Sequence, residues 1–549
     1  MTEVEPPTVT ELNKTFYIPH HAVLKADSTS TPLRVVMDAS SHVPGKMSLN
    51  QALYSGPKLQ RDLVEILINF GLHKYVMLTD IRQMFRMIQV EPRQRQYQRI
   101  LWRPHPDSPI TDYQLNVLVF GFTSSPFLAI RTLLYLADKY KDFPVASQIL
   151  RTQTFVDDFT FGNDDLDMIE NMRDQLIGLL SKGKFELRKW ASNTRSLLDG
   201  FPEEHIQNID FSFDSESNVS LKILGLKWSP VKDQFFFTFK NFESKCTKRT
   251  MLSELARTFD PMGILTPITF HTKILIQRLW TLGLGWDEIP PKDLVDKWSH
   301  FKGDLTVLSS FALPRHIDFR DTYSCHLIGF CDASIEGTCT VTYLRIEYRS
   351  SAVKAHFLLA KSKVAPSQSV SLPRLELDAA VLLSKLLKYV TEVLKDKICL
   401  ADIFAFSDSS VALSWIKNSP HLWKTYVANR VAFIQERVPP NKWHHLPINR
   451  LTRWKLLVRM LTDFWKRWKT EYLHTLTQRS KWHFPDKSTP RIGDMVLIKS
   501  DNEPPLEWAL GRITDLNYGT DGIARVASVR IAKGILRMPL VKLCPLPTY

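Results

Sequence analysis

Two adjacent carboxylates, Asp157 and Asp158, are the residues of this chain whose chemistry is most specific. They lie between Phe155-Val156 and Phe159. Apolar residues that flank a tight pair of acids predict a β-hairpin whose turn carries those acids. Proteins rarely concentrate so much negative charge among aromatic residues without a cation to neutralise it. The pattern therefore predicts a metal-binding turn, and the alternative is the polar tip of an ordinary hairpin.

A third acid, Asp80, follows the apolar run that starts at Tyr75. This run predicts a short buried strand with the acid at its end. If that strand neighbours the hairpin in one antiparallel sheet, three carboxylates can hold two divalent ions about 3.5–4 Å apart, as in-line phosphoryl transfer requires. One ion would activate a 3′-hydroxyl and the other would bind the triphosphate. Carboxylates favour Mg²⁺, or Mn²⁺ in its place, over softer metals.

The composition is that of a globular protein. The chain has 549 residues, of which 44% are hydrophobic and 23% charged, and it has room for roughly three or four domains. No apolar run approaches the ~20 residues that span a membrane, and the acidic N-terminus is not of the signal-peptide type. Six scattered cysteines without a CxxC pair favour a reducing compartment. We expect a cytoplasmic or nuclear protein that is not secreted and has no membrane partner.

The net charge is +14, and the excess is concentrated near the C-terminus. Residues 451–549 contain 17 Lys and Arg against 9 Asp and Glu, a surplus of eight. A basic surplus of this size favours a polyanionic partner, although proteins without such a partner also carry one.

Nine motifs in the first half of the chain together resemble the reverse transcriptase of BEL/Pao-type LTR retrotransposons, and they cover most of residues 16–280. In chain order they are Tyr17–Val23, Leu33–Ser40, Leu78–Phe85, Gln98–Arg103, Phe120–Phe127, Phe155–Asp158, Phe185–Ser192, Leu224–Trp228 and Phe259–Ile264. The resemblance implies an RNA-directed DNA polymerase of the right-hand type, with palm, fingers and thumb. It also implies an RNA template, a DNA primer, dNTPs, and Mg²⁺ or Mn²⁺.

The resemblance assigns roles to individual residues. Asp80, Asp157 and Asp158 would be the catalytic metal ligands. Arg34 would contact the triphosphate as a fixed positive fork, and Phe85 would exclude the ribose 2′-hydroxyl. The nucleotide pocket would be lined by Gly121, Ser125 and Pro126, since glycine permits close backbone approach. Lys189 would lie near the pyrophosphate. The alternative for Arg34 is an ordinary surface arginine, and for Phe85 an ordinary core aromatic residue. Lys189 could equally be a solvated lysine.

A second set of acids follows a strand, helix, strand pattern. Asp332 ends the apolar run 327–331, Glu376 lies near the start of a helix over 372–394, and Asp408 ends a second strand. This order resembles the ribonuclease H domain of the same elements, which uses a fourth carboxylate after a Trp-His-x-x-Pro segment. Here the segment ending at Pro447 is followed by Ile-Asn-Arg, so the fourth carboxylate is missing from this position. We therefore expect impaired ribonuclease activity, or a domain that is retained for its fold.

The C-terminal block resembles an integrase C-terminal domain. Residues 451–482 predict a basic amphipathic helix, and short apolar runs at 491–498, 511–516, 524–531 and 539–543 predict strands of a small SH3-like barrel. Tyr472, Trp482 and Trp508, with nearby basic residues, would bind DNA backbone, or would simply pack.

We therefore expect an α+β multidomain protein with a truncated ribonuclease H-like α/β domain. The predicted parts are a loose N-terminus (1–15), fingers and palm (16–209), thumb and connection (210–318), a ribonuclease H-like domain (319–447) and a basic C-terminal domain (451–549). No protease motif or integrase core is found, so the chain resembles an internally deleted derivative joined near 447–451, without strand transfer or polyprotein cleavage. The alternatives are a non-catalytic nucleic-acid-binding remnant and a chain that misfolds. The sequence leaves the oligomeric state open.

Overall fold

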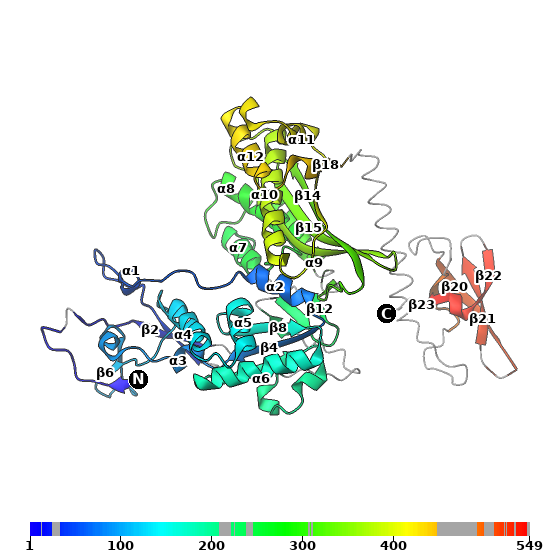
Figure 1. Ribbon diagram of the computed structural model, residues 1–549. Coiled ribbons are helices and arrows are strands. Elements are labelled where there is room, and N and C mark those ends of the chain that lie inside the picture. Colours follow the sequence, from blue (N-terminus) through cyan, green and yellow to red (C-terminus); the bar gives the residue numbers. More distant parts are fainter. Residues whose placement is uncertain are drawn as a thin grey trace. The chain divides into compact units, whose positions relative to one another are not determined.

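The computed structural model forms two compact units, Met1–His445 and Leu446–Tyr549, each described by itself (Figure 1). The structure describes the whole chain except residues 12–13, 25–32, 208–220, 224–225, 238–244, 306–307, 309–310, 447–490, 499–509, 521, 523, 532–533 and 546–549. Among the described residues, no helix is both long enough and apolar enough to cross a lipid bilayer.

The central sheet of the first unit is antiparallel, with strand order β7-β8-β4-β9. Its strands are β4 (Tyr75–Ile81), β7 (Thr154–Phe155), β8 (Asp158–Asn163) and β9 (Leu187–Ser192). Both the strand and the hairpin expected from the sequence are confirmed. Successive side chains of a strand point to opposite faces, and those of β4 accordingly enter two different cores. Val76 and Leu78 belong to one core, and Met77 and Ile81 belong to the other.

Helices cover both faces of this sheet. The core around Met77 and Ile81 is closed by α4 (Ser125–Lys139), α5 (Pro144–Thr152) and α6 (Leu166–Lys182). Helix α6 turns a single apolar stripe toward the sheet, as expected for a surface helix. The stripe consists of Ile169, Met172, Leu176, Leu179 and Leu180. On the opposite face lies α2 (Leu63–Leu72), in which every residue from Ile66 onward is buried.

The N-terminal segment contributes small sheets and short helices. One sheet joins β1 (Thr2–Glu3), β6 (Thr111–Gln114) and β5 (Arg99–Trp102). A separate hairpin pairs β2 (His20–Leu24) with β3 (Leu33–Met37). The short helices are α1 (Leu49–Ala52) and α3 (Met84–Met87).

A second small sheet and three helices follow the central sheet. The sheet has the order β10-β11-β12-β13 and consists of β10 (Leu221–Ile223), β11 (Leu226–Ser229), β12 (Gln234–Phe236) and β13 (Ala312–Pro314). The helices are α7 (Lys248–Arg257), α8 (Thr266–Thr281) and α9 (Lys292–Leu305).

The last part of the first unit is a five-stranded mixed sheet of order β16-β15-β14-β17-β18. Its strands are β14 (Thr322–Ser334), β15 (Gly337–Tyr348), β16 (Val353–Val364), β17 (Asp402–Ser407) and β18 (Trp443–His445). Helix α10 (Leu372–Leu394) lies against β14 and β15 (Figure 1), with the bounds that its apolar stripe predicts. Two shorter helices follow, α11 (Ser410–Lys417) and α12 (Thr425–Gln435).

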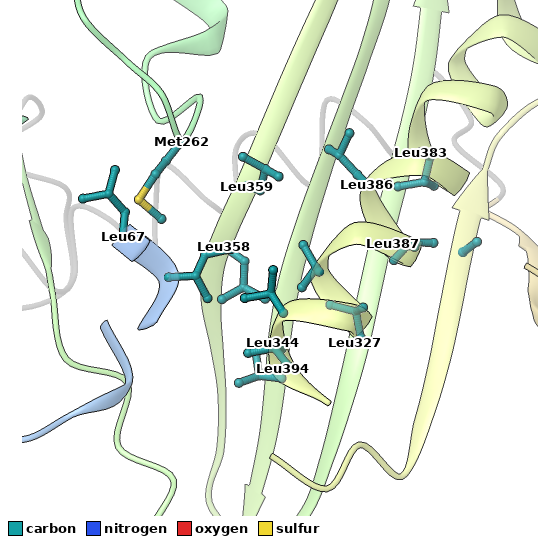
Figure 2. Close-up of a cluster of buried hydrophobic side chains, with 14 of the residues drawn as sticks. Leu67, Met262, Leu327, Leu344, Leu358, Leu359, Leu383, Leu386, Leu387 and Leu394 are labelled. Atoms are coloured by element: carbon teal, nitrogen blue, oxygen red, sulfur yellow. The ribbon is translucent and has the colours of Figure 1, made fainter. Parts of the chain in front are cut away.

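One hydrophobic core joins the central sheet to the mixed sheet. Leu67 of α2 belongs to the same buried cluster as Leu358 of β16 and Leu394 of α10, and Met262 lies between them (Figure 2). From Ile66 onward α2 is buried on all sides, and the mixed sheet supplies part of the cover that such a largely apolar helix needs. The two sheets therefore form one folded body.

The second unit is a five-stranded antiparallel sheet of order β22-β21-β20-β19-β23. Its strands are β19 (Met495–Ile498), β20 (Leu510–Tyr518), β21 (Ala524–Ile531), β22 (Gly534–Pro539) and β23 (Leu543–Pro545). The prediction of a strand over residues 539–543 is wrong. Residues Leu540–Lys542 form a 3-10 turn, because Pro539 has no N–H for the sheet and ends β22.

Several expectations fall on residues outside the described ones. They concern the helix over 451–482, the junction near 447–451, the aromatic residues Tyr472, Trp482 and Trp508, and the start of the Leu224–Trp228 motif.

Candidate metal-binding carboxylate sites

The first set of acids meets at the edge where β4 and the β7–β8 hairpin adjoin. Asp80 and Asp158 are direct partners in the antiparallel pairing of β4 with β8. Asp157 lies in the turn, and its carbonyl oxygen accepts the N–H of Ile81 at 3.0 Å. The strand and the hairpin expected from the sequence are therefore neighbours, which is the arrangement that a shared metal site needs.

The turn that carries Asp157 is held in an unusual conformation. Val156 has φ +58°, a left-handed conformation that costs a β-branched residue about 1–3 kcal/mol. The side chain of Gln60 holds the backbone on both sides of Phe155. Its Oε1 accepts the N–H of Val156 at 3.0 Å, and its Nε2 donates to the carbonyl of Thr154 at 3.3 Å. Sequence reasoning missed Gln60, which lies in a stretch without periodic pattern.

Three carboxylates share this edge with one nearby ammonium. Burial, followed by the charges of Asp157 and Asp80, raises the pKa of Asp158 to about 7. Burial is also the largest cause that raises the pKa of Asp157. The ammonium of Lys189, on β9, forms an ion pair with Asp80. The remaining negative charge and the purely oxygen donor set fit Mg²⁺ or Mn²⁺, and these carboxylates would hold the metal.

The aromatic residue expected near the nucleotide packs onto a neighbouring motif. Phe85, on α3, is buried, and its ring centroid lies 4.6 Å from that of Phe120. Two motifs far apart in the sequence are thus brought together.

Gly121 has a steric reason to be glycine. Its φ is +103°, and a Cβ built there would lie 2.1 Å from the carbonyl oxygen of Met37 on β3. Ser125 is buried at the start of α4, where its hydroxyl donates to the carbonyl of Val119 at 2.8 Å, and Pro126 follows in the first turn. The segment therefore packs directly against β3.

Arg34 is a predicted site residue for which no contact in the described part of the chain leads to the acids, and the contacts of Phe85, Gly121 and Ser125 described above also go to other residues. It is exposed on β3, opposite Val23 of β2. Within the described residues, no recorded contact joins its side chain to Asp80, Asp157 or Asp158.

The second set of acids is gathered more tightly. Asp332 of β14, Glu376 of α10 and Asp408 after β17 each offer an oxygen within 4.8 Å of the others. Within the described part of the chain, this is the one trio of potential ligands grouped so closely. Parallel pairing of β14 with β17 places Cys331 opposite Ser407, so the acids that follow them lie at the same sheet edge.

Two buried oxygens of this second site lack protein donors, whereas Asp332 Oδ1 accepts the N–H of Ala333 at 2.8 Å. Burial, then Asp408 and Asp332, raises the pKa of Glu376 to about 8. No described residue donates a hydrogen bond to Glu376 Oε2 or Asp408 Oδ1, although both atoms are buried. Buried carboxylate oxygens without donors fit a divalent cation. Near them, His445 Nε2 lies 3.1 Å from the carbonyl oxygen of Asp408.

Two family models match segments of the chain. Residues 247–409 match the model described as a Pao retrotransposon-like RNaseH-like domain, a segment that includes all three acids of the second site. Residues 452–546 match a family of unknown function, DUF5641. No curated protein matches the chain.

Two solved structures resemble the chain. One is the foamy viral protease-reverse transcriptase in complex with an RNA/DNA hybrid, with a TM-score of 0.50 and 13% identity, covering 97% of this chain and 60% of that one. The other is the foamy viral protease-reverse transcriptase dRH in complex with double-stranded DNA, with a TM-score of 0.49 and 14% identity, covering 79% of this chain and 66% of that one. The chain thus spans 60% of the length of the first structure. It has a mixed α/β fold similar to that of a retroviral reverse transcriptase, and its Pao-like ribonuclease H segment supports a retroelement polyprotein as its origin.

Proposed function

We propose that this chain is a retrotransposon-derived RNA-directed DNA polymerase that uses Mg²⁺ or Mn²⁺. The observation that carries the proposal is the direct pairing of Asp80 with Asp158 across β4 and β8, with Asp157 in the adjoining turn. The foamy viral structure of similar fold was solved with an RNA/DNA hybrid, which supports an RNA template and a DNA primer as partners here.

Each residue of the site has a task in nucleotidyl transfer. Asp80, Asp157 and Asp158 hold the metals. When bound, the metals lower the pKa of the primer 3′-hydroxyl and neutralise the triphosphate. Phe85 limits the space beside the nucleotide sugar and so favours dNTPs. Lys189, which forms an ion pair with Asp80, would contact the triphosphate in a complex with metals bound.

Primer extension on an RNA template tests the proposal. Replacing Asp157 with asparagine should reduce synthesis by at least about 10²-fold, because even partners outside the ligand shell of a metal can contribute that much. The exposed Asp142, replaced in the same way, is the matched control. Metal-independent synthesis, or equal synthesis by Asp157→Asn and wild type, would show that these acids do not carry the reaction.

The second carboxylate site supports a second activity, cleavage of the RNA strand of a hybrid. The grouping of Asp332, Glu376 and Asp408, with two buried oxygens that lack donors, favours it. We propose that turnover is impaired, because the sequence after Pro447 lacks the expected fourth acid. Digestion of a hybrid with labelled RNA, by wild type and by Glu376→Gln, measures this activity. Cleavage that persists in Glu376→Gln would assign it to another site or to a contaminant.

The alternative to an enzyme is a non-catalytic remnant that binds nucleic acid, including DNA through the basic C-terminal domain. The charge surplus of residues 451–549 favours this binding. Log affinity should then fall by about 0.7–0.9 per phosphate contacted for each log unit of salt. Binding with this slope but without metal-dependent synthesis would favour the remnant. Affinity that is independent of salt would exclude a phosphate-binding role.

A further inference from the structure

The Asp157–Asp158 turn depends on contacts from outside the hairpin. Val156 lies between Phe155 and Asp157 with φ +58°, which β-branched side chains disfavour. Only two residue pairs, Thr154 with Phe159 and Phe155 with Asp158, form the β7–β8 pairing. A hairpin this short is marginal by itself, so the position of Asp157 depends on contacts from outside the hairpin. These are the Ile81 N–H, which donates to the Asp157 carbonyl at 3.0 Å, and whatever holds Val156.

Gln60 supplies that hold. It is 96 residues from Val156 in sequence, yet its Oε1 accepts the Val156 N–H at 3.0 Å, and its Nε2 donates to the carbonyl of Thr154 at 3.3 Å. An amide offers an acceptor and a donor together. A carboxylate would offer acceptors alone, and a thioether of similar length would offer no donor. We infer that Gln60 is a positioning residue for the metal-binding turn, an inference that rests on the proposed polymerase function.

The two residues after Gln60 fix the segment from which its amide reaches the turn. Arg61 Nε donates to the carbonyl of Arg151, at the end of α5, at 2.8 Å. Asp62 caps α2 by accepting the N–H of Val64 at 2.8 Å, and it also accepts the hydroxyl of Tyr389 at 3.0 Å. Three consecutive side chains therefore attach to three different elements. The backbone of Gln60 has little freedom, and its amide stays aimed at Val156.

Tyr389 connects the segment around Gln60 to the ribonuclease H-like domain, through its hydrogen bond to Asp62. It lies on α10, the helix that also carries Glu376 of the second carboxylate site. The ribonuclease H-like domain thus touches the segment that positions the polymerase turn, through Tyr389 and Asp62. We place Tyr389 in the same role as Gln60, one step further from the metal-binding acids.

Metal binding provides a readout that does not require polymerase activity. Mn²⁺ affinity is measured by the electron paramagnetic resonance of free Mn²⁺, with Glu376→Gln present in every variant to remove the second site. Gln60→Met, which keeps the side-chain length, should weaken binding about 10-fold and lower kcat by about 10–100-fold, as for groups that orient metal ligands. KM for dNTP should change less than about 3-fold, because nucleotide contacts remain. Tyr389→Phe should give a smaller loss in the same direction.

Rescue separates positioning from a general loss of structure. Glycine adopts positive φ readily, so Val156→Gly combined with Gln60→Met should recover most of the lost Mn²⁺ affinity. Gln148, exposed on α5, is replaced by methionine as the matched control and should behave as wild type. Unchanged Mn²⁺ affinity in Gln60→Met, or no recovery in the double variant, would overturn the inference. If the wild type makes no DNA, the proposed function fails, and the Mn²⁺ comparison still decides the role of Gln60.

Discussion

Arg315 is a buried arginine outside both carboxylate sites, and its replacement tests how the central sheet is supported. Its side chain is 0% exposed and forms a two-point ion pair with Asp233, with Nε–Oδ1 at 2.6 Å and Nη2–Oδ2 at 2.7 Å. The same guanidinium donates to the carbonyls of Phe70, His73 and Lys74. It thereby fixes the link between α2 and β4, the strand that carries Asp80.

The expected loss follows from these partners. Removing one member of a buried pair costs about 3–5 kcal/mol. Asp233 remains 25% exposed and still accepts hydrogen bonds from Trp228 Nε1 at 2.9 Å and Asn193 Nδ2 at 3.2 Å. Because these contacts remain, the loss should lie at the lower end of this range, and Arg315→Met should reduce the free energy of unfolding by about 3 kcal/mol. Arg315→Lys should cost less, because it keeps the charge and loses the planar fork.

Native-state hydrogen exchange of the β4 amides is the assay, because it reports local opening free energies in a chain this large. A loss of about 3 kcal/mol corresponds to exchange on the order of 10²-fold faster. Arg320→Met is the matched control, since Arg320 forms an exposed pair with Asp318, at 53% and 40% side-chain exposure, and exposed pairs contribute little to stability. If β4 exchanges equally fast in Arg315→Met and Arg320→Met, the buried arginine does not support the strand.

Three further predictions concern the site itself. Gly121→Ala should lower the free energy of unfolding by at least about 2 kcal/mol, as measured by thermal melts. Gly45→Ala is the control and should cost less, because Gly45 has φ +81° but no neighbour within 4 Å. Equal losses in the two variants would contradict the steric argument. Because the folded-state pKa of Asp158 is raised from 3.8 to about 7, the metal-free folded protein binds more protons than the unfolded chain between these values, so its stability should fall as pH rises through that window. This part of the pH dependence should vanish in Asp158→Asn, and an unchanged slope would contradict it. Lys189→Met should tighten Mn²⁺ binding roughly 5-fold, because Asp80 is released from a partly exposed ion pair that contributes about 1 kcal/mol. Weaker Mn²⁺ binding in this variant would show that Lys189 does not compete with the metal.

Much of the local structure could be predicted from the sequence, because it depends on short-range patterns. The apolar run before Asp80 gave β4, and the alternation around Asp157 gave the hairpin. The stripe over 372–394 gave the full length of α10. Even the meeting of Asp80 with the Asp157–Asp158 pair was expected, since a strand-end acid and a hairpin acid can meet in one sheet.

The contacts that orient these acids could not be predicted, because tertiary register alone brings them together. Gln60 and Val156 are 96 residues apart, and Lys189 and Asp80 are 109 apart. Polar side chains of this kind carry no periodic signal, so the sequence left Lys189 open between the site and solvent. The apolar run of α2 predicts burial, but it does not reveal that α10 supplies part of the cover.

The leucine-rich core between α2 and α10 also affects which substitutions related copies of this chain can tolerate. A substitution at Glu376 could end the proposed RNA cleavage without touching Leu67, Leu358 or Leu394. A stop codon ahead of α10, by contrast, would remove part of the cover of α2, and β4 begins three residues after α2 ends. Selection for the proposed DNA synthesis alone would then preserve the ribonuclease H-like fold in a lineage whose second carboxylate site decays. Among related copies, the leucines should accordingly drift more slowly than the acids beside them.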